Sequence, residues 1–168
     1  KVVGDAAFEI GVQNSEQVDV TTQSTTVALT QFTQPLLDTA QTVNVIPQYI
    51  MQEQQVTTLR DTLRNSPGIS IAAGEGGAQG DNLTIRGFSA RNDMFLDGIR
   101  DFGSYYRDAF DYEQVAVLQG PASVQFGRGS TGGVINQETK QPQTNQFARG
   151  SLQLGTNLMR RVTGDINV

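Results

Sequence analysis

A glycine-rich stretch followed directly by a β-branched run is the feature that most limits what this chain can fold into. Gly127, Gly129 and Gly132 stand at the spacing G-x-G-x-x-G, and Gly133-Val-Ile-Asn136 follows them. A dinucleotide-binding loop of this spacing needs a helix after it, because the amides at the helix N-terminus hold the pyrophosphate. The residues after Gly132 favour a strand instead. The glycines are therefore predicted to serve tight turns and close backbone contact.

The residue types that the chain lacks exclude several kinds of site. It contains no cysteine and no histidine, which removes thiolate and imidazole catalysis, disulfides and the usual zinc sites. Its 12 basic and 17 acidic side chains give a net charge of −5, so no nucleic-acid partner is expected. No stretch approaches the roughly 18 apolar residues of a membrane-spanning helix, and the N-terminus lacks a signal-peptide pattern. These features indicate a cytosolic protein or a mature exported one.

Short strands separated by turn residues are predicted through the middle of the chain. Asp97-Gly98, between two apolar runs, predicts a hairpin. The glycine-rich residues 72–80 and the mixed residues 100–112 are predicted to be loops. The predicted strands are residues 42–46, 69–71, 83–85, 94–96, 115–118 and 134–136.

Two short helices are predicted after the first of these strands. Pro47 suits the first turn of a helix that runs to Gln54. Thr57 or Thr58 then caps a second helix over residues 59–63, which Pro67-Gly68 ends.

The two ends of the chain differ from this middle part. Residues 1–33 are rich in polar side chains and are predicted to form a flexible arm, in which residues 16–22 alternate briefly. From Phe147 onward, apolar and polar residues alternate as in strands of a transmembrane barrel wall. A hairpin alone is marginally stable in water, so the chain is predicted to be part of a longer protein.

Two chemical roles are open for the acidic and tyrosine side chains. Loop aspartates could act as a carboxylate pair in an enzyme, and Tyr105, Tyr106 and Tyr112 could bind ferric iron directly. Solvated acids, turn residues and packed tyrosines explain the same residues, and nothing in the spacing selects a catalytic pair. The aspartates concerned are Asp93, Asp97, Asp101, Asp108 and Asp111.

Five motifs occur in order between about Pro35 and Pro142. They are Leu63-Arg-Asn-Ser-Pro-Gly-Ile69, Leu83-Thr-Ile-Arg-Gly-Phe88, Met94-Phe-Leu-Asp-Gly-Ile-Arg100, Val115-Ala-Val-Leu-Gln-Gly-Pro-Ala122 and Phe126-Gly-Arg-Gly-Ser-Thr-Gly-Gly-Val-Ile-Asn136. Together they closely resemble the plug domain of TonB-dependent outer-membrane receptors. Residues 95–108 are most similar to receptors for ferric catecholate siderophores.

This resemblance implies a fold and a domain organisation. The fold expected is an α+β plug domain with a small mixed β-sheet and short helices. The plug would span residues 34–142, after a periplasmic arm of residues 1–33. Residues 147–168 would be the first strands of an otherwise missing transmembrane β-barrel.

The resemblance also implies a function. The chain would be the plug of an active transporter that imports ferric siderophore complexes, most similar to catecholate receptors, with energy from TonB. It would be no enzyme and would need no intrinsic cofactor, the ferric siderophore being the transported ligand. Its partners would be TonB, the siderophore and its own β-barrel, in the outer membrane of a Gram-negative bacterium. The alternative is a stand-alone periplasmic ligand-binding or interaction module without a transport role.

In the family, outward plug loops form the floor of the ligand site. That implies ligand contacts from the loops at residues 74–81 and 100–112. The region from Arg91 to Glu113 is net negative, which argues against an anion site there. The alternative is that Arg100 and Arg107 pair with Asp101, Asp108 or Asp111, because exposed charges usually form such pairs or face water. The ligand-binding candidates are Gln79, Arg100, Tyr105, Tyr106 and Arg107.

Two further roles are implied by the same resemblance. Arg86 and Arg128 resemble plug arginines that pair with barrel glutamates and lock the plug to the wall. The candidate TonB box would pair with a strand of the coupling protein by β-augmentation. A short unstructured Thr/Val run is the alternative for the box, which consists of Glu16, Gln17, Val18, Asp19 and Val20.

Overall fold

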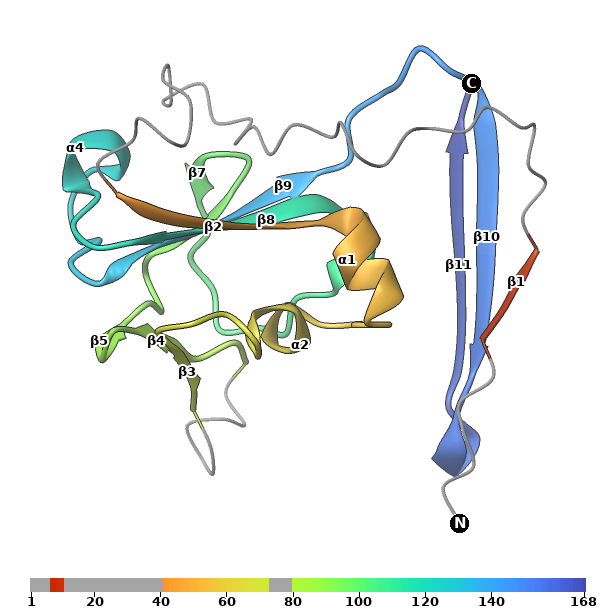
Figure 1. Ribbon diagram of the computed structural model, residues 1–168, viewed down its shortest axis with the longest axis horizontal. Helices are drawn as coiled ribbons and strands as arrows, with labels where there is room; N and C mark the ends of the chain where they lie inside the picture. The colour runs from red at the N-terminus through yellow and green to blue at the C-terminus, as the bar shows by residue number, and fades with distance from the viewer. Residues whose placement is uncertain (1–6, 11–40, 73–79) are drawn as a thin grey trace. The chain divides into compact units, whose positions relative to one another are not determined.

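The computed structural model describes residues 7–10, 41–72 and 80–168 (Figure 1). These residues form two compact units. The sheet unit consists of residues 41–72 and 80–140, and the hairpin unit of residues 7–10 and 141–168. Among the described residues of both units, no helix is long and apolar enough to cross a membrane.

A five-stranded mixed sheet is the centre of the sheet unit, with the strand order β2-β8-β9-β6-β7. Strand β8 pairs antiparallel with β2 and β9, whereas β9 pairs parallel with β6. The predicted mixed sheet is therefore confirmed. The bounds are β2 Thr42–Pro47, β6 Met94–Leu96, β7 Ile99–Arg100, β8 Tyr112–Gln119 and β9 Gly133–Thr139.

The hairpin predicted at Asp97-Gly98 joins β6 to β7. Both turn residues have positive φ, 51° at Asp97 and 78° at Gly98, as a two-residue type I′ turn requires. The Asp97 carboxylate accepts hydrogen bonds from the backbone N and the hydroxyl of Thr139, each at 2.8 Å. The turn is thereby fixed to the end of the neighbouring strand β9.

A smaller antiparallel sheet and two helices complete one side of the unit. The sheet has the order β3-β4-β5, with β3 Ile69–Ile71, β4 Leu83–Ile85 and β5 Phe88–Ser89. Helix α1 (Gln48–Glu53) begins directly after Pro47, as predicted. Helix α2 (Leu59–Leu63) is capped by Thr58, whose hydroxyl accepts from the Asp61 backbone N at 3.2 Å.

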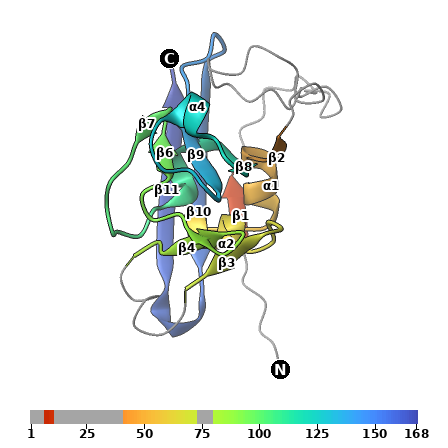
Figure 2. The same ribbon diagram turned by 90° about the vertical axis from the view of Figure 1, so that its left-hand side faces the viewer.

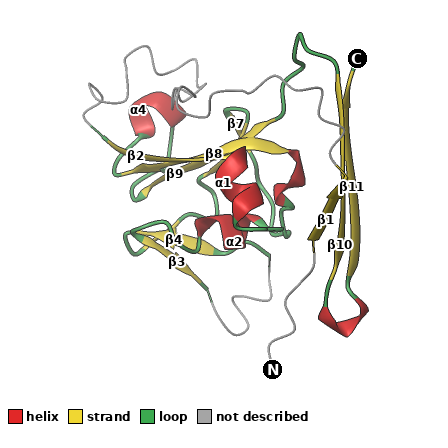
Figure 3. Ribbon diagram, turned by 45° about the vertical axis from the view of Figure 1, so that its right-hand side comes forward, coloured by secondary structure: helices red, strands yellow, loops and turns green. Residues whose placement is uncertain are grey.

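The hydrophobic core has two parts, one on each face of the five-stranded sheet. The larger part contains the fully buried Leu59, Leu63 and Ile135 and joins the sheet to both helices and the small sheet. The smaller part contains Phe95 and Phe126, whose rings meet edge to face at 4.8 Å, and includes helix α4 (Ser123–Phe126). Figures 1 and 2 show α2 with β3 and β4 on one side of the sheet, and Figure 3 shows α4 on the other.

The glycine stretch connects α4 to β9 through close backbone contacts. A Cβ atom added at Gly132 would lie 2.4 Å from the Ile85 carbonyl oxygen, and one at Gly133 would lie 2.1 Å from the Leu118 carbonyl oxygen. Strand β9 begins at Gly133, so no helix follows that could hold a pyrophosphate. The predicted close approach is confirmed at Gly132, whereas Gly127 and Gly129 have the positive φ of turn glycines.

The hairpin unit has the two-residue alternation predicted from Phe147 onward. Strands β10 (Phe147–Leu154) and β11 (Arg160–Asn167) pair antiparallel, with a short 3-10 turn, η4 (Thr156–Leu158), between them. One face carries apolar pairs such as Leu152 with Val162, and Val162 is 76 % exposed. On the other face the hydroxyls of Ser151 and Thr163 are hydrogen-bonded at 2.5 Å.

Strand β1 (Ala7–Ile10) corrects one part of the sequence analysis. It pairs antiparallel with β10 along Gly150 to Gln153, although residues 1–33 were predicted to form a flexible arm. That prediction is wrong for these four residues. An edge strand presents unpaired backbone groups, and an extended segment can pair with them without any side-chain period in its own sequence.

A buried carboxyl group at the end of β9 should make the stability of the fold depend on pH. Glu138 is 9 % exposed and accepts hydrogen bonds from the side chains of Gln114 and Asn136. Burial raises its pKa, and the two hydrogen bonds offset part of the rise. The folded chain therefore binds a proton at pH values where the unfolded chain has lost it, so the free energy of unfolding falls as pH rises through this window.

Glu138→Gln should remove this part of the pH dependence, because an amide cannot ionise. We expect the decline above the ordinary carboxyl pKa to flatten, although the amide, with one acceptor oxygen, keeps only one of the two hydrogen bonds. Urea unfolding of the chain at a series of pH values measures the slope of this decline. Glu53→Gln, at an exposed position of α1, is the control and should leave the decline in place. An equal decline in Glu138→Gln and the original chain would contradict the assignment.

Candidate functional site

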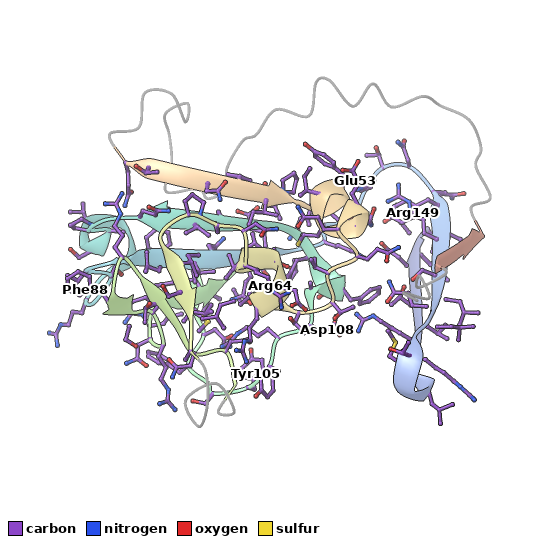
Figure 4. All side chains as sticks on the ribbon, turned by 60° about the horizontal axis from the view of Figure 1, so that its bottom comes forward. Glu53, Arg64, Phe88, Tyr105, Asp108 and Arg149 are labelled. Atoms are coloured by element: carbon purple, nitrogen blue, oxygen red, sulfur yellow. The ribbon has the colours of Figure 1, made fainter. Side chains whose placement is uncertain are left out.

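The loop after β7 carries the most concentrated group of exposed aromatic side chains in the described part of the sheet unit. The segment begins at Asp101, directly after β7, and is followed by the 3-10 turn η3 (Ala109–Asp111). Phe102 is 72 % exposed, Tyr105 47 % and Tyr106 54 %. Figure 4 shows Tyr105 at the lower edge of the sheet unit in that view. We call residues 101–106 the aromatic loop.

The end of this segment is more ordered and more buried than an exposed loop of residues 100–112 would be. Ala109 is 7 % exposed and Tyr112 6 %, and Tyr112 is already the first residue of β8. The Ala109 backbone N donates to the Thr57 carbonyl, and the Leu59 backbone N donates to the Arg107 carbonyl, each at 3.0 Å. The predicted loop therefore ends near Arg107, because these backbone bonds fix the chain from there onward to the start of α2.

Arg107 lies beneath the aromatic loop with a side chain only 1 % exposed. Its Nη2 lies 2.8 Å from Asp101 Oδ2, and its Nη1 lies 3.5 Å from Asp81 Oδ2. The structure therefore has the alternative considered for this arginine, a pairing with Asp101. A surface position for Arg107, which direct contact with a ligand would need, is not what the structure has, because the two carboxylates draw the guanidinium inward.

Asp81 is the partner that the sequence did not reveal. It is 2 % exposed, and its Oδ2 accepts the Arg107 backbone N at 2.9 Å. Its own backbone N donates to the Tyr105 carbonyl at 3.1 Å. Burial raises the pKa of the Asp81 carboxyl, and the hydrogen bonds and charge of Arg107 offset part of that rise. Among the described residues, Asp81 Oδ1 has no hydrogen-bond partner.

Tyr105 is held in place on two sides although nearly half of it is exposed. Its hydroxyl donates to Asp101 Oδ2 at 2.6 Å, and the Arg107 guanidinium carbon lies 4.1 Å from the ring centroid. The hydrogen bond to Asp101 and partial burial raise the pKa of the Tyr105 hydroxyl, which keeps it in the neutral form that donates. Tyr106, the other predicted tyrosine contact, is exposed beside it.

Arg100 lies at the end of β7 and reaches the glycine stretch. Its Nη2 donates to the Phe126 carbonyl at 3.2 Å and also to the Arg128 carbonyl. Its guanidinium carbon lies 5.2 Å from the ring centroid of Phe95 and 5.8 Å from that of Phe102. Arg100 therefore connects the aromatic loop to the loop before β9, and a ligand role for it stays a prediction.

The two arginines expected to lock the plug are both exposed on this chain. Arg86 has a φ of 51°, and its Nε donates to Gln119 Oε1 at 3.2 Å. The Arg128 carbonyl accepts from Arg100. Pairing of either arginine with barrel glutamates stays a prediction. Gln79 and the candidate TonB box, residues 16–20, lie outside the described residues.

Four of the five aspartates weighed as catalytic acids act as hydrogen-bond acceptors, and Asp111 lies in η3. Asp93 Oδ1 accepts from the Ser130 backbone N at 3.0 Å, and Asp108 caps η3 by accepting from the Phe110 backbone N at 2.8 Å. Asp97 and Asp101 are hydrogen-bonded as described above. These bonds favour the interpretation of the aspartates as turn residues.

Iron binding by the three tyrosines together is contradicted at Tyr112. Its hydroxyl donates to Gln137 Oε1 at 2.7 Å inside the sheet unit, and Gln137 in turn donates to the Phe95 carbonyl at 3.1 Å. Burial raises the Tyr112 pKa well above its usual value, which disfavours the phenolate that ferric iron would need. Tyr112 is a core residue and not part of the aromatic loop.

A pocket of about 200 Å³ lies elsewhere, between β2, α1 and the residues after α2. Asn44, Gln54 and Asn65 are among its lining residues, and none of the ligand-binding candidates is. Its volume is below the usual 300–1,000 Å³ or so of small-molecule sites. The aromatic loop, an exposed platform, is therefore the better candidate site.

Sequence reasoning selected Tyr105 and Tyr106 but missed the exposed Phe102 and the buried Asp81. Phe102 lay within the stretch most similar to catecholate receptors, so its aromatic ring was a usable signal. For Asp81 no local signal exists, because the aspartate stands far from Arg107 in the chain.

The chain is similar to known proteins over most of its length. Residues 35–134 match the family model "TonB-dependent Receptor Plug Domain". The probable TonB-dependent siderophore receptor PiuA of Acinetobacter baumannii is 45 % identical over 141 residues, which cover 83 % of this chain and 19 % of that protein. The catecholate siderophore receptor Fiu of Escherichia coli K12 is 39 % identical over 140 residues, which cover 82 % of this chain and 18 % of that protein.

The solved structures give the same result for the fold. The crystal structure of the siderophore receptor PiuA from Acinetobacter baumannii superposes with a TM-score of 0.78 at 44 % identity. The match covers 83 % of this chain and 20 % of that one. The chain thus spans about a fifth of the length of the curated relatives it matches.

Proposed function

The chain belongs to the TonB-dependent receptor plug domain family, and from that premise we propose that it is the plug of an outer-membrane active transporter for ferric siderophores. In this proposal it is not an enzyme, and the ferric complex is cargo. TonB supplies the energy from the periplasmic side, where the N-terminal arm lies. The alternative of a stand-alone periplasmic module is not favoured, because the relatives are named siderophore receptors and the chain spans about a fifth of their length.

The observation that carries the proposal is the aromatic loop. Three exposed aromatic side chains, Phe102, Tyr105 and Tyr106, stand on one short segment, and the acidic Asp101 among them is neutralised from below by Arg107. Ferric catecholates are aromatic, so they can stack on such rings. The 39 % identity to a receptor named for catecholates supports the same class of cargo.

Energy coupling is the second part of the proposal. Residues 16–20 are proposed to pair with a strand of TonB, and Arg86 and Arg128 to hold the plug against barrel carboxylates. Both arginines are exposed on the sheet unit and so are accessible to another domain.

Uptake of iron by cells that carry the whole receptor tests the proposal. We expect uptake of iron supplied as a ferric catecholate, little uptake from a ferric hydroxamate, and loss of uptake by more than about tenfold when residues 16–22 are deleted. Deletion of residues 23–29 shortens the arm by the same length and is the control.

Each part of the proposal has its own contradicting result. Uptake from the hydroxamate alone would overturn the class of cargo. Catecholate uptake that survives the deletion of residues 16–22, or that is lost equally in the control, would overturn the position of the box. The amount of receptor in the outer membrane must be equal in all strains.

A further inference from the structure

We propose that Arg107 is a positioning residue, which holds the aromatic loop in its binding shape from below without touching the ligand. This inference rests on the proposed function, since it concerns the same loop. It replaces the expected direct contact between Arg107 and the ligand, because the guanidinium is buried.

The Arg107 side chain bonds several residues of the aromatic loop at once. Arg107 Nε donates to Asp101 Oδ2 at 2.9 Å, and Nη2 forms an ion pair with the same oxygen at 2.8 Å. Nη1 donates to the Tyr105 carbonyl at 3.3 Å, and Nη2 to the Gly103 carbonyl at 3.4 Å. The planar fork of the guanidinium thus contacts the start, the middle and the end of the aromatic loop together.

The Arg107 guanidinium is itself held in place by Asp81. Asp81 accepts from Arg107 Nη1 at 3.5 Å and from the Arg107 backbone N at 2.9 Å. Asp81 also donates its backbone N to the Tyr105 carbonyl. Asp81 stands just before β4 of the small sheet. Its bonds to Arg107 therefore fix the guanidinium, and with it the aromatic loop, relative to that sheet.

The bonds of Arg107 also fix the exposed aromatic rings of the loop. The Tyr105 ring stacks on the guanidinium at 4.1 Å, and its hydroxyl is bonded to Asp101, the residue that Arg107 also binds. A side chain added at Gly103 would lie 2.7 Å from the Tyr105 ring, so the loop is closely packed around this residue. Phe102 and Tyr106, on either side, project from a backbone whose carbonyls Arg107 holds.

The consequence is preorganisation. A loop of three exposed aromatic residues would lose conformational entropy on binding if it were free, and a loop already ordered by Arg107 loses less. Lysine at this position keeps the charge but cannot bond Asp101, Gly103 and Tyr105 in one plane. Affinity should therefore fall in Arg107→Lys even though no ligand contact is removed.

The test uses the whole receptor and the ferric complex of 2,3-dihydroxybenzoate as probe. We expect Arg107→Lys to raise the Kd by about tenfold and to speed amide hydrogen exchange in residues 101–107 more than in β8 and β9. Tyr105→Phe removes only the hydroxyl bonded to Asp101 and should raise the Kd by a smaller factor. Arg64→Lys, at a 70 % exposed arginine beside α2, is the control and should leave the Kd unchanged.

A receptor that lacks the aromatic side chains distinguishes a positioning role of Arg107 from direct contact with the ligand and from a general loss of stability. In a receptor with Phe102, Tyr105 and Tyr106 all changed to alanine, Arg107→Lys should have almost no further effect on residual binding. A direct ligand contact by Arg107, or a general loss of stability, would persist in that background and would overturn the proposal. So would an unchanged Kd in Arg107→Lys.

Failure of the proposed function gives a different result. A wild-type receptor that does not bind the catecholate probe would overturn the proposed cargo, and the positioning role for that cargo with it. Hydrogen exchange would then still report whether Arg107 orders the loop. Binding by the wild type together with unchanged exchange and affinity in Arg107→Lys would instead overturn the positioning role alone.

Discussion

Gly133→Ala is expected to lower the free energy of unfolding by more than about 3 kcal/mol. Gly133 has a φ of 145°, which side chains rarely allow, and an added Cβ would lie 2.1 Å from the Leu118 carbonyl oxygen. That oxygen belongs to β8, next to β9 in the middle of the sheet, so neither strand can move aside without breaking the ladder. Urea unfolding followed by circular dichroism measures the loss.

Gly127→Ala is the matched control for this prediction. Gly127 also has a positive φ, 80°, but nothing lies within 4 Å of an added Cβ. Its ψ of −157° places it in a backbone region that only glycine adopts readily, so the cost should be limited to this strain, about 1–3 kcal/mol. If the two alanine variants lost the same stability, backbone strain alone would account for both and the predicted clash with β8 would be wrong.

Ile135→Ala is expected to lower the free energy of unfolding by about 2–5 kcal/mol. Ile135 is fully buried in the larger core, on the central strand β9, and its backbone N donates to the Asp93 carbonyl at 3.0 Å. Truncation leaves a cavity between the five-stranded sheet and the elements packed on it, which the paired strands cannot fill by moving. Urea unfolding measures this loss as well.

Ile99→Ala is the comparison in the same sheet. Ile99 lies on the edge strand β7 and is 74 % exposed, so its truncation should change the free energy of unfolding by no more than about 0.5 kcal/mol. Equal losses in the two variants would mean that β9 is not the centre of the cooperative unit.

Residues whose effect is local made much of this fold predictable. Pro47 directly precedes α1, Thr58 caps α2, and Asp97-Gly98 forms the hairpin turn, because each acts on its own backbone within a few residues. The alternation from Phe147 likewise gave the two faces of the hairpin unit. The order of strands in the five-stranded sheet was not predicted from these signals, since it depends on pairings between distant segments.

The candidate site was predictable in its location but not in the roles of its arginines. A loop rich in tyrosine, arginine and aspartate was evident, and the exposed Tyr105 and Tyr106 are in it. Whether an arginine in such a loop faces water or a buried carboxylate depends on a partner elsewhere in the chain. Arg107 is buried because it pairs with Asp81, and no local sequence pattern connects these two residues.

The position of β9 has a consequence for how the sheet unit forms. Strand β9 is the last strand of this sheet in the sequence, yet it lies in the middle and joins β8 to β6. The parallel pairing with β6 closes a long loop, and such distant contacts slow folding. Until β9 has emerged during synthesis, β6 and β7 have no partner that connects them to β2 and β8. A chain that stops before Gly133 would keep two unjoined sheet fragments with exposed apolar strands, which makes it a substrate for chaperones and proteases and prone to aggregation.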